Sequence, residues 1–430
     1  MQKTLNEKLN NVLSVIKTAL SHEYFSAVLL LCGFICWFFG LTNLLVYSYV
    51  SIFILTLILC QDVKNIFSMV FFVAFFITDI TGEEVPWTTY IIAISLAVIT
   101  LIGFLVKNVI TNRKNIKKGQ MFYAFIFAGV AFLMGGIQRF NYLAFLITLG
   151  LFVATYILYF IIVNFTQNFK DFFIKLFVFG GIILAVQTII TKTDKSVIDF
   201  VMLGTQHINV LCEYLLISLI CAFVLAIEKD NLLFIVPVLL YLLGVFLTEC
   251  TTVKILSIVA MVVLMVIAVI KAKKKGIYLT VFGVATLCVL ILLILKREEI
   301  FAKFTAFFNG SAQDNGRKVL WPWCFDRFKE YPVFGYGFVS DMHVPTTRNN
   351  YLLIVLAHNT PLQWLTSLGI VGCLLMAYFY FSKYKIAFSK ITLSKLAYAL
   401  ILIFIEVCGL LDQAPAMDFF MFFIPLAIIA

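Results

Sequence analysis

The feature that most constrains this sequence is a succession of apolar runs, each close to the length needed to cross a lipid bilayer. A transmembrane helix needs about 20 predominantly apolar residues. Runs of this kind follow one another along the chain and are separated by short polar breaks. The hydrophobic fraction is 63% and the charged fraction is 13%, which leaves too little polar surface to cover a water-soluble globule. The sequence therefore predicts an all-α, polytopic bundle of transmembrane helices.

Fourteen candidate spans can be delimited, three of them short, so we predict a bundle of 12–14 spans. They cover residues 24–41, 43–60, 65–79, 88–107, 120–134, 140–164, 172–191, 209–227, 231–247, 253–270, 276–295, 360–381, 394–411 and 417–430. This pattern predicts four regions along the chain. They are a short cytoplasmic amphipathic segment at 1–23, a transmembrane bundle at 24–295, one large external loop at 296–359 and C-terminal transmembrane helices at 360–430.

Basic residues set the predicted orientation, because short cytoplasmic loops are enriched in Lys and Arg. Basic clusters occur at 113–118, at 271–275 and at Lys383, Lys385 and Lys390. With the N-terminus inside, fourteen spans place all three clusters on the cytoplasmic side and the loop at 296–359 outside. This distribution also accounts for the net charge of +10. The charge does not indicate nucleic-acid binding, because the sequence has no large basic patch interleaved with aromatic residues.

The cysteines do not form a pattern typical of a metal site or a disulfide framework. The chain has ten, and most lie inside apolar runs. No Cys-x-x-Cys pair or Cys/His spacing indicates zinc. We interpret the cysteines as small apolar residues and predict no bound metal and no cofactor.

Ionisable residues within apolar runs are costly and mark candidate functional positions. In the predicted topology they gather at the outer ends of spans rather than at mid-membrane, where a proton-driven carrier would place them. These residues are Arg139, His207, Glu213, Glu249, Lys254, Glu406, Asp412 and Asp418. The distribution predicts a site at the outer leaflet beneath the large loop. The alternative is that they are ordinary charges at loop ends.

The large loop carries the pattern best suited to chemistry. Residues 318–330 predict a short interfacial helix that ends at Tyr331-Pro332. Downstream, Pro361 suits the first position of a helix and Thr360 the cap before it, so His358 is predicted just outside a helix N-terminus.

These positions favour anion handling. Unpaired N–H groups at a helix N-terminus attract anions, and Arg317 can hold phosphate oxygens through two parallel hydrogen bonds. A histidine such as His358 exchanges protons near neutral pH. The loop therefore predicts a phosphate or diphosphate site, with a purely structural or solvated histidine as the alternative.

This pattern resembles the O-antigen ligase and repeat-unit polymerase family, the Wzy-type membrane glycosyltransferases of bacteria. The family pattern has an Arg, a Trp a few residues later, a Pro followed by Gly-x-Gly, and a His-Asn before a helix containing Gly-x-x-Gly. The matching residues are Arg317, Trp321, Pro332, Gly335, Gly337, His358, Asn359, Gly369 and Gly372. The family often has a Ser-Arg pair at the outer start of the span at 253–270, where this chain has Lys254. Lysine keeps the charge but not the bidentate guanidinium.

The resemblance implies a GT-C-like bundle in the bacterial cytoplasmic membrane. It further implies a metal-independent glycosyltransferase that passes a glycan from undecaprenyl diphosphate to an acceptor hydroxyl on the outer face. His358 and Arg317 are then the expected catalytic residues. The expected contacts to the diphosphate or glycan are Lys254, Arg139, Arg348, Trp321 and Asn359.

The resemblance leaves the acceptor open. We expect a repeat-unit polymerase, which works in the lipid bilayer, on lipid-linked glycans, and alongside other membrane proteins of polysaccharide assembly. One alternative is a ligase that acts on a lipid core or a protein. Another is a transporter or flippase of the lipid-linked glycan, for which inverted repeats and broken helices would be expected.

Overall fold

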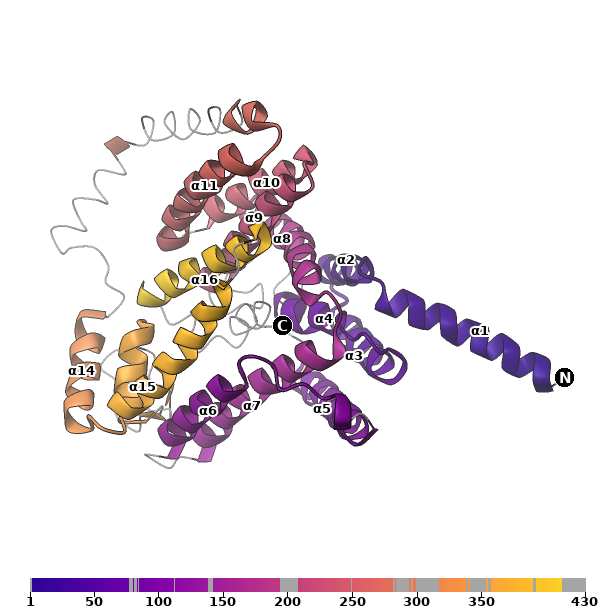
Figure 1. Cartoon of the computed structure of the whole chain (residues 1–430), viewed down its shortest axis with the longest axis horizontal. Coiled ribbons are helices and arrows are strands. Elements are labelled where there is room, and N and C mark those ends of the chain that lie inside the picture. Colours follow the sequence, from indigo (N-terminus) through magenta and orange to yellow (C-terminus); the bar gives the residue numbers. More distant parts are fainter. Residues whose placement is uncertain are drawn as a thin grey trace.

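The structure, a computed structural model, is a bundle of helices with a small β-pair (Figure 1). It describes residues 2–76, 80, 83, 85–111, 113–137, 142–193, 208–248, 250–280, 283, 294, 297–298, 317–337, 339–340, 353–354, 357–389 and 392–411.

The described helices follow the predicted spans closely. They are α1 (Gln2–Ser21), α2 (Phe25–Phe38), α3 (Thr42–Leu59), α4 (Ile66–Phe72) with the short helix η1 (Val73–Phe76), α5 (Trp87–Thr111), η2 (Arg113–Asn115), α6 (Phe122–Ile137), α7 (Tyr142–Phe165), α8 (Phe169–Thr193), α9 (Ile208–Glu228), η4 (Leu232–Phe234), α10 (Ile235–Leu247), α11 (Thr251–Lys271), α14 (Arg317–Glu330), α15 (Thr360–Ala387) and α16 (Leu393–Leu411). A helix occupies every predicted span except 276–295 and 417–430, which lie wholly or mostly outside the described residues.

Several helices have the length and composition of membrane spans. In the described part of the chain, six qualify: α3, α5, α8, α9, α11 and α15, trimmed by a few residues at some ends. Three further apolar helices are shorter, in the regions of α6, α7 and α10. The chain is therefore a multi-pass, all-α membrane protein, as predicted. Its orientation stays a prediction.

Helix α1 projects from the bundle, and its C-terminal end packs against α2 and α3 (Figure 1). The bend between its last residues, Asn10–Ser21, and α2 is 80°. An amphipathic helix that turns this sharply before the first apolar helix is suited to lie along a membrane surface. The cytoplasmic amphipathic segment expected at residues 1–23 stays a prediction.

Helix α9 is the centre of the bundle, since 94% of its span is buried. It packs against α8, α10, α11 and α16. Small residues at the helix contacts allow neighbouring backbones to pack closely, as is common in membrane proteins. A side chain at Gly181 of α8, for example, would place its Cβ 2.4 Å from the Ser218 side chain of α9.

Helix α15 is broken at Gly369, where φ is 62° and ψ is −168°. The indole Nε1 of Trp364 donates to the hydroxyl of Tyr380 at 3.4 Å. These residues would lie about 24 Å apart along a straight helix, so α15 must bend sharply between them. We call Thr360–Leu368 the first arm and Ile370–Ala387 the second arm.

The second arm corrects the prediction for Lys383. We expected this residue in a cytoplasmic basic loop, but the helix continues to Ala387 and buries it. Its Nζ lies 2.6 Å from Oε1 of Glu406, which sits inside α16 rather than at its end. The lysine stays within the bundle because a carboxylate there compensates its charge.

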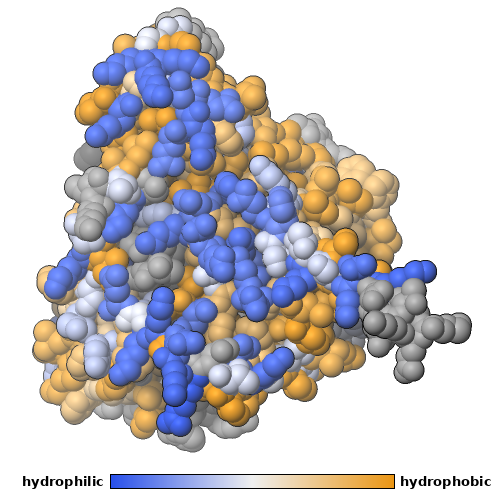
Figure 2. Space-filling model, turned by 45° about the vertical axis from the view of Figure 1, so that its right-hand side comes forward, coloured by the Kyte–Doolittle hydropathy of each residue, from blue (hydrophilic) through white to orange (hydrophobic). Residues whose placement is uncertain are grey.

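The surface has the character of a membrane protein. Figure 2 shows hydrophilic residues gathered across the middle of one face, with hydrophobic surface bordering them. Many large apolar side chains of α5 are exposed, including Ile91, Ile99 and Ile110. Such a helix faces lipid rather than water.

Candidate functional site

The site begins with α14, a helix that forms where the sequence predicted one at 318–330; its interfacial position stays a prediction. Its buried residues Leu320 and Cys324 pack with Ala357, just before α15. Thr366 Oγ1 of the first arm also donates to the Cys324 carbonyl, at 3.3 Å. Burial raises the pKa of the Cys324 thiol to about 11, so this thiol stays protonated and is not a ready nucleophile. Helix α14 therefore lies firmly along the first arm (Figure 1).

The residue before His358 is held from two sides. The indole Nε1 of Trp321 donates to the Ala357 carbonyl at 2.9 Å. The Ala357 N–H donates to Oε1 of Gln363 at 2.8 Å. One bond comes from α14 and the other from α15, so the position of this backbone is fixed relative to both helices.

The residue after His358 is held as well. Asn359 Oδ1 accepts from the Leu362 N–H at 2.9 Å and caps α15. Asn359 Nδ2 donates to the Leu410 carbonyl near the end of α16, at 2.8 Å. The chain from Ala357 to Asn359, which we call the His358 turn, is thus tied to three helices.

His358 itself has φ of 48°, in the left-handed region, and is half-buried. Residues other than glycine rarely adopt this conformation, and holding one there costs on the order of 1–3 kcal/mol. The bonds to Ala357 and Asn359 offset that cost. Backbone strain of this kind, sustained by its surroundings, is common at functional sites.

Two details of this helix start differ from the sequence prediction. The cap is Asn359, one residue earlier than predicted, and Thr360 is the first helical residue. The helix start also offers few free N–H groups: Pro361 has none, and those of Leu362 and Gln363 donate to Asn359. The predicted use of this helix N-terminus as an anion site is therefore not supported.

The glycine motif of the loop meets the break in α15. The Tyr336 and Gly337 N–H groups donate to the carbonyls of Thr366 and Ser367, at 2.7 and 3.1 Å. These carbonyls belong to the last turn of the first arm, where a helix ends with unsatisfied acceptors.

The beginning of the second arm is satisfied in the same way. Its Ile370 and Val371 N–H groups donate to the carbonyls of Pro332 and Val333, at 2.9 and 3.1 Å. Irregular backbone within an apolar bundle persists where its polar groups find partners. We call residues 332–337 the docking segment, because they complete the hydrogen bonding of the broken helix.

Beside the His358 turn, α14 and α15 enclose an open groove of about 780 Å³. Its walls are mostly apolar and aromatic. They are formed by Trp321, Pro322, Phe325, Asn359, Pro361, Leu362, Leu365 and Cys373. The groove starts at Asn359 and reaches the second arm at Cys373, so it connects the His358 turn with the apolar part of the bundle.

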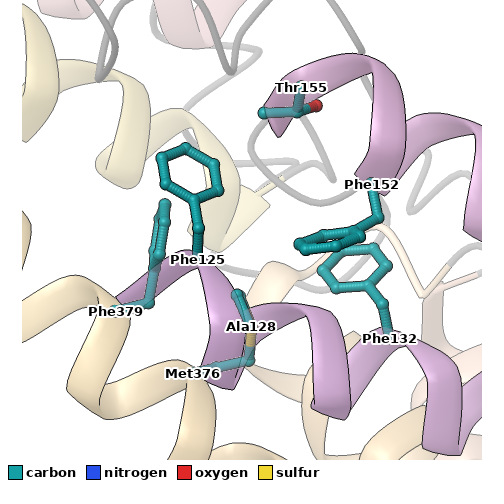
Figure 3. Close-up of a pocket in the computed structure, with 7 residues that line it drawn as sticks. All are labelled: Phe125, Ala128, Phe132, Phe152, Thr155, Met376 and Phe379. Atoms are coloured by element: carbon teal, nitrogen blue, oxygen red, sulfur yellow. The ribbon is translucent and has the colours of Figure 1, made fainter. Parts of the chain in front are cut away.

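A second, smaller cavity is a packing gap rather than a binding site. It holds about 20 Å³ and lies where the second arm crosses α6 and α7. Figure 3 shows its aromatic walls, formed by Phe125 and Phe132 of α6, Phe152 of α7 and Phe379 of α15. An apolar space of this size is suited to neither substrate nor ordered water.

The other predicted site residues are only partly placed. Arg317 is the first residue of α14, one turn before Trp321, and its side chain lies outside the described part. Lys254 is half-buried in the first turn of α11, a helix that contacts α16. Glu213 is buried in α9. Outside the described residues are Arg139, Arg348, His207, Glu249, Asp412 and Asp418.

One residue of the site was not predicted from the sequence. Gln363 is fully buried; its Oε1 accepts from Ala357, and its Nε2 donates to Ser367 Oγ at 2.7 Å. A glutamine one turn into a membrane helix is itself a signal, because a buried amide needs hydrogen-bond partners.

In the described part of the chain, no group of three or more His, Cys, Asp or Glu residues is placed to hold a metal ion. A model of the family described as O-Antigen ligase (Wzy_C) matches residues 236–377, about a third of the chain. This range includes α10, α11, α14, the His358 turn and the break in α15, and the match confirms the family resemblance. No curated protein and no solved structure matches the chain.

Proposed function

We propose that this chain, whose residues 236–377 match the model of the O-antigen ligase family, is a membrane glycan polymerase. The family assignment supports a role in membrane glycan assembly. The proposed reaction transfers an oligosaccharide from a polyprenyl diphosphate to a hydroxyl of an acceptor glycan, on the outer face of the bacterial cytoplasmic membrane. The observation that carries the proposal is the His358 turn, fixed by three helices at the mouth of an apolar groove.

In the proposed reaction His358 is the general base. The imidazole takes the proton of the acceptor hydroxyl as its oxygen bonds to the anomeric carbon of the donor sugar. The bond between that carbon and the diphosphate oxygen breaks, and polyprenyl diphosphate leaves with the electron pair. A base fixed in position contributes roughly 10²–10⁴-fold to such a step. The bonds to Ala357 and Asn359 supply this fixed position.

The leaving diphosphate gains negative charge, and we propose that cationic side chains stabilise it. Arg317 lies at the start of the helix whose Trp321 contacts the His358 turn, and its guanidinium suits bidentate phosphate binding. We keep Lys254, Arg139 and Arg348 as further candidates. Because Asn359 uses Oδ1 and Nδ2 within the protein, and Trp321 donates to Ala357, we propose that these two position the turn.

The apolar groove supports a lipid-linked donor. Its aromatic and aliphatic walls run from the His358 turn to Cys373, so the polyprenyl chain has an apolar place to lie while its diphosphate stays at headgroup depth. Apolar lining with a few polar groups at one end is typical of sites for amphipathic ligands.

A transporter is the second candidate, since broken helices are frequent in transport proteins. Helix α15 is broken at Gly369, but the backbone N–H and carbonyl groups that such a break would offer to a solute are hydrogen-bonded to the docking segment. A test with purified protein and an undecaprenyl-diphosphate oligosaccharide separates the candidates. Longer lipid-linked glycans support the polymerase, transfer only to a lipid core or protein supports a ligase, and movement across vesicles without bond formation supports a transporter.

Arg317→Ala should lower the transfer rate on the order of 10²-fold, by analogy with loss of a donor to developing negative charge. Arg317→Lys should recover little, because the ammonium lacks the planar fork. Rates of glycan lengthening at matched protein amounts measure both effects. Lys329→Ala is the control, since Lys329 is exposed at the other end of α14. An Arg317→Ala variant as fast as Lys329→Ala would remove Arg317 from the proposed chemistry.

Transfer should persist when divalent cations are removed, because we propose that side-chain cations stabilise the diphosphate. The experiment compares rates in EDTA with rates in added Mg²⁺ or Mn²⁺, using the same purified protein. We expect these rates to agree within about twofold. A rate that collapses in EDTA and returns with Mg²⁺ would contradict metal independence and leave the glycan-transfer assignment intact.

A further inference from the structure

A buried ion pair joins the second arm of α15 to α16. Lys383 is 2% exposed, and its Nζ lies 2.6 Å from Oε1 of Glu406. The rings of Tyr380 and Tyr384 lie 4.3 and 5.3 Å from the same ammonium, measured to the ring centroids. The charge is thus compensated by one carboxylate and by two aromatic faces, which attract cations.

Such a pair is a poor source of stability. Desolvating two charges costs about as much as their attraction returns, and an apolar pair of similar size often serves as well. Such a pair can instead supply specificity, because a packing of the helices that separates the two charges leaves both of them buried and uncompensated. The place where the pair fixes the packing therefore matters.

The pair lies close to the anchors of the His358 turn. Glu406 precedes Leu410 by one turn of α16, about 6 Å, and the Leu410 carbonyl accepts from Asn359. Tyr380, beneath Lys383, accepts from the indole of Trp364 in the first arm. Contacts thus run from the ion pair to Asn359, the residue after His358, and to Trp364 in the first arm.

We propose that Lys383 and Glu406 are positioning residues for His358. The ion pair sets the packing of α16 on α15, so that the Leu410 carbonyl meets Asn359 and holds the turn at the mouth of the groove. This inference rests on the proposed function for its catalytic consequence. The geometric consequence, a fixed His358 turn, stands independently of the reaction.

The test compares Lys383→Met, Glu406→Gln and the charge-swapped Lys383→Glu/Glu406→Lys variant. Lys385→Met is the matched control, because Lys385 lies two residues away on the same helix and is exposed. The first readout is transfer. We expect kcat to fall by 10-fold to on the order of 10²-fold in the single variants, since small displacements of catalytic groups have effects of this size. KM should change little, and the swap should restore only part of kcat, because its carboxylate then faces the rings of Tyr380 and Tyr384.

The second readout needs no activity. In each background, His358→Cys is labelled with a membrane-impermeant maleimide, and labelling is quantified on the peptide containing residue 358. We expect labelling to be at least several-fold faster in Lys383→Met than in Lys385→Met. The swap variant should label at a rate between these two. If the wild-type protein transfers no glycan, the proposed function fails, but the labelling readout still tests whether the ion pair positions the His358 turn. Failure of this inference is therefore distinguishable from failure of the proposed function.

A folded Lys383→Met variant with unchanged kcat and unchanged labelling would overturn the proposal. If Lys383→Met does not fold, Lys383→Met/Glu406→Leu replaces it, because that variant leaves no unpaired charge. We expect it to fold, as judged by its melting temperature in detergent, and to label rapidly. Labelling as slow as in the Lys385→Met control would show that the ion pair does not position the turn.

Discussion

His358→Asn should reduce glycan transfer by on the order of 10²–10⁴-fold, the contribution of a positioned general base, while the protein folds normally. Asparagine is the informative substitution because it tolerates the left-handed backbone that His358 adopts. It also keeps a polar side chain but cannot take a proton. The bonds of Ala357 and Asn359 do not involve the imidazole, so the turn should survive.

His358→Ala is expected to be as inactive, with at most a small change in stability, because histidine and alanine both pay the cost of the left-handed backbone. Initial rates of glycan lengthening and melting temperatures in detergent measure the two effects separately. Asn359→Ala provides the contrast, since it removes a cap and the bond to Leu410 but leaves the imidazole in place. Near-normal chain lengthening by His358→Asn at matched expression would exclude His358 from the chemistry.

The parts of this structure that were predictable from sequence are those decided locally. Apolar run lengths located the helices, and the Tyr331-Pro332 pair located the end of α14. For the site, the sequence correctly predicted that His358 lies just before the start of a helix. The exact cap was not, because Asn359 and Thr360 are both good caps and the bond to Leu410, 51 residues away in sequence, favours Asn359.

What the sequence did not show depends on distant partners. Lys383 follows an apolar run and looks like a loop residue until Glu406, 23 residues later in the sequence, is placed beside it. The break at Gly369 likewise has no local cause that periodicity detects. A glycine inside an apolar run is common in membrane helices, and only the docking segment explains why this one leaves the helical conformation.

Gly369→Ala and Gly335→Ala should both be strongly damaging substitutions. Both glycines have positive φ, 62° and 78°. A Cβ at Gly369 would lie 2.4 Å from the Gly335 nitrogen, and one at Gly335 would lie 2.4 Å from the Ser367 carbonyl carbon. These neighbours are backbone atoms, so no side-chain rotation relieves the overlap, and the docking segment must move away.

Both glycine substitutions should lower the stability of the protein and its rate of glycan transfer. If the docking segment moves away, it loses its four backbone hydrogen bonds to α15. Each of these bonds contributes roughly 0.5–1.5 kcal/mol net to stability. The left-handed conformation adds about 1–2 kcal/mol per alanine. Without its partners the break is free to change its angle, and the first arm would carry the His358 turn away from Leu410. We therefore expect a lower melting temperature and transfer reduced by at least 10²-fold.

Gly103→Ala is the matched control, because this glycine lies within α5 and a Cβ there meets open space. It should leave transfer unchanged and be neutral or stabilising by up to about 1 kcal/mol, since alanine favours a helix. Gly335→Ala is the decisive variant: it leaves α15 untouched in sequence and alters only the segment that docks onto it. If it lengthens glycans and melts as Gly103→Ala does, the docking segment does not hold the break, and the bonds of the His358 turn to α14, α15 and α16 are enough to fix the position of His358.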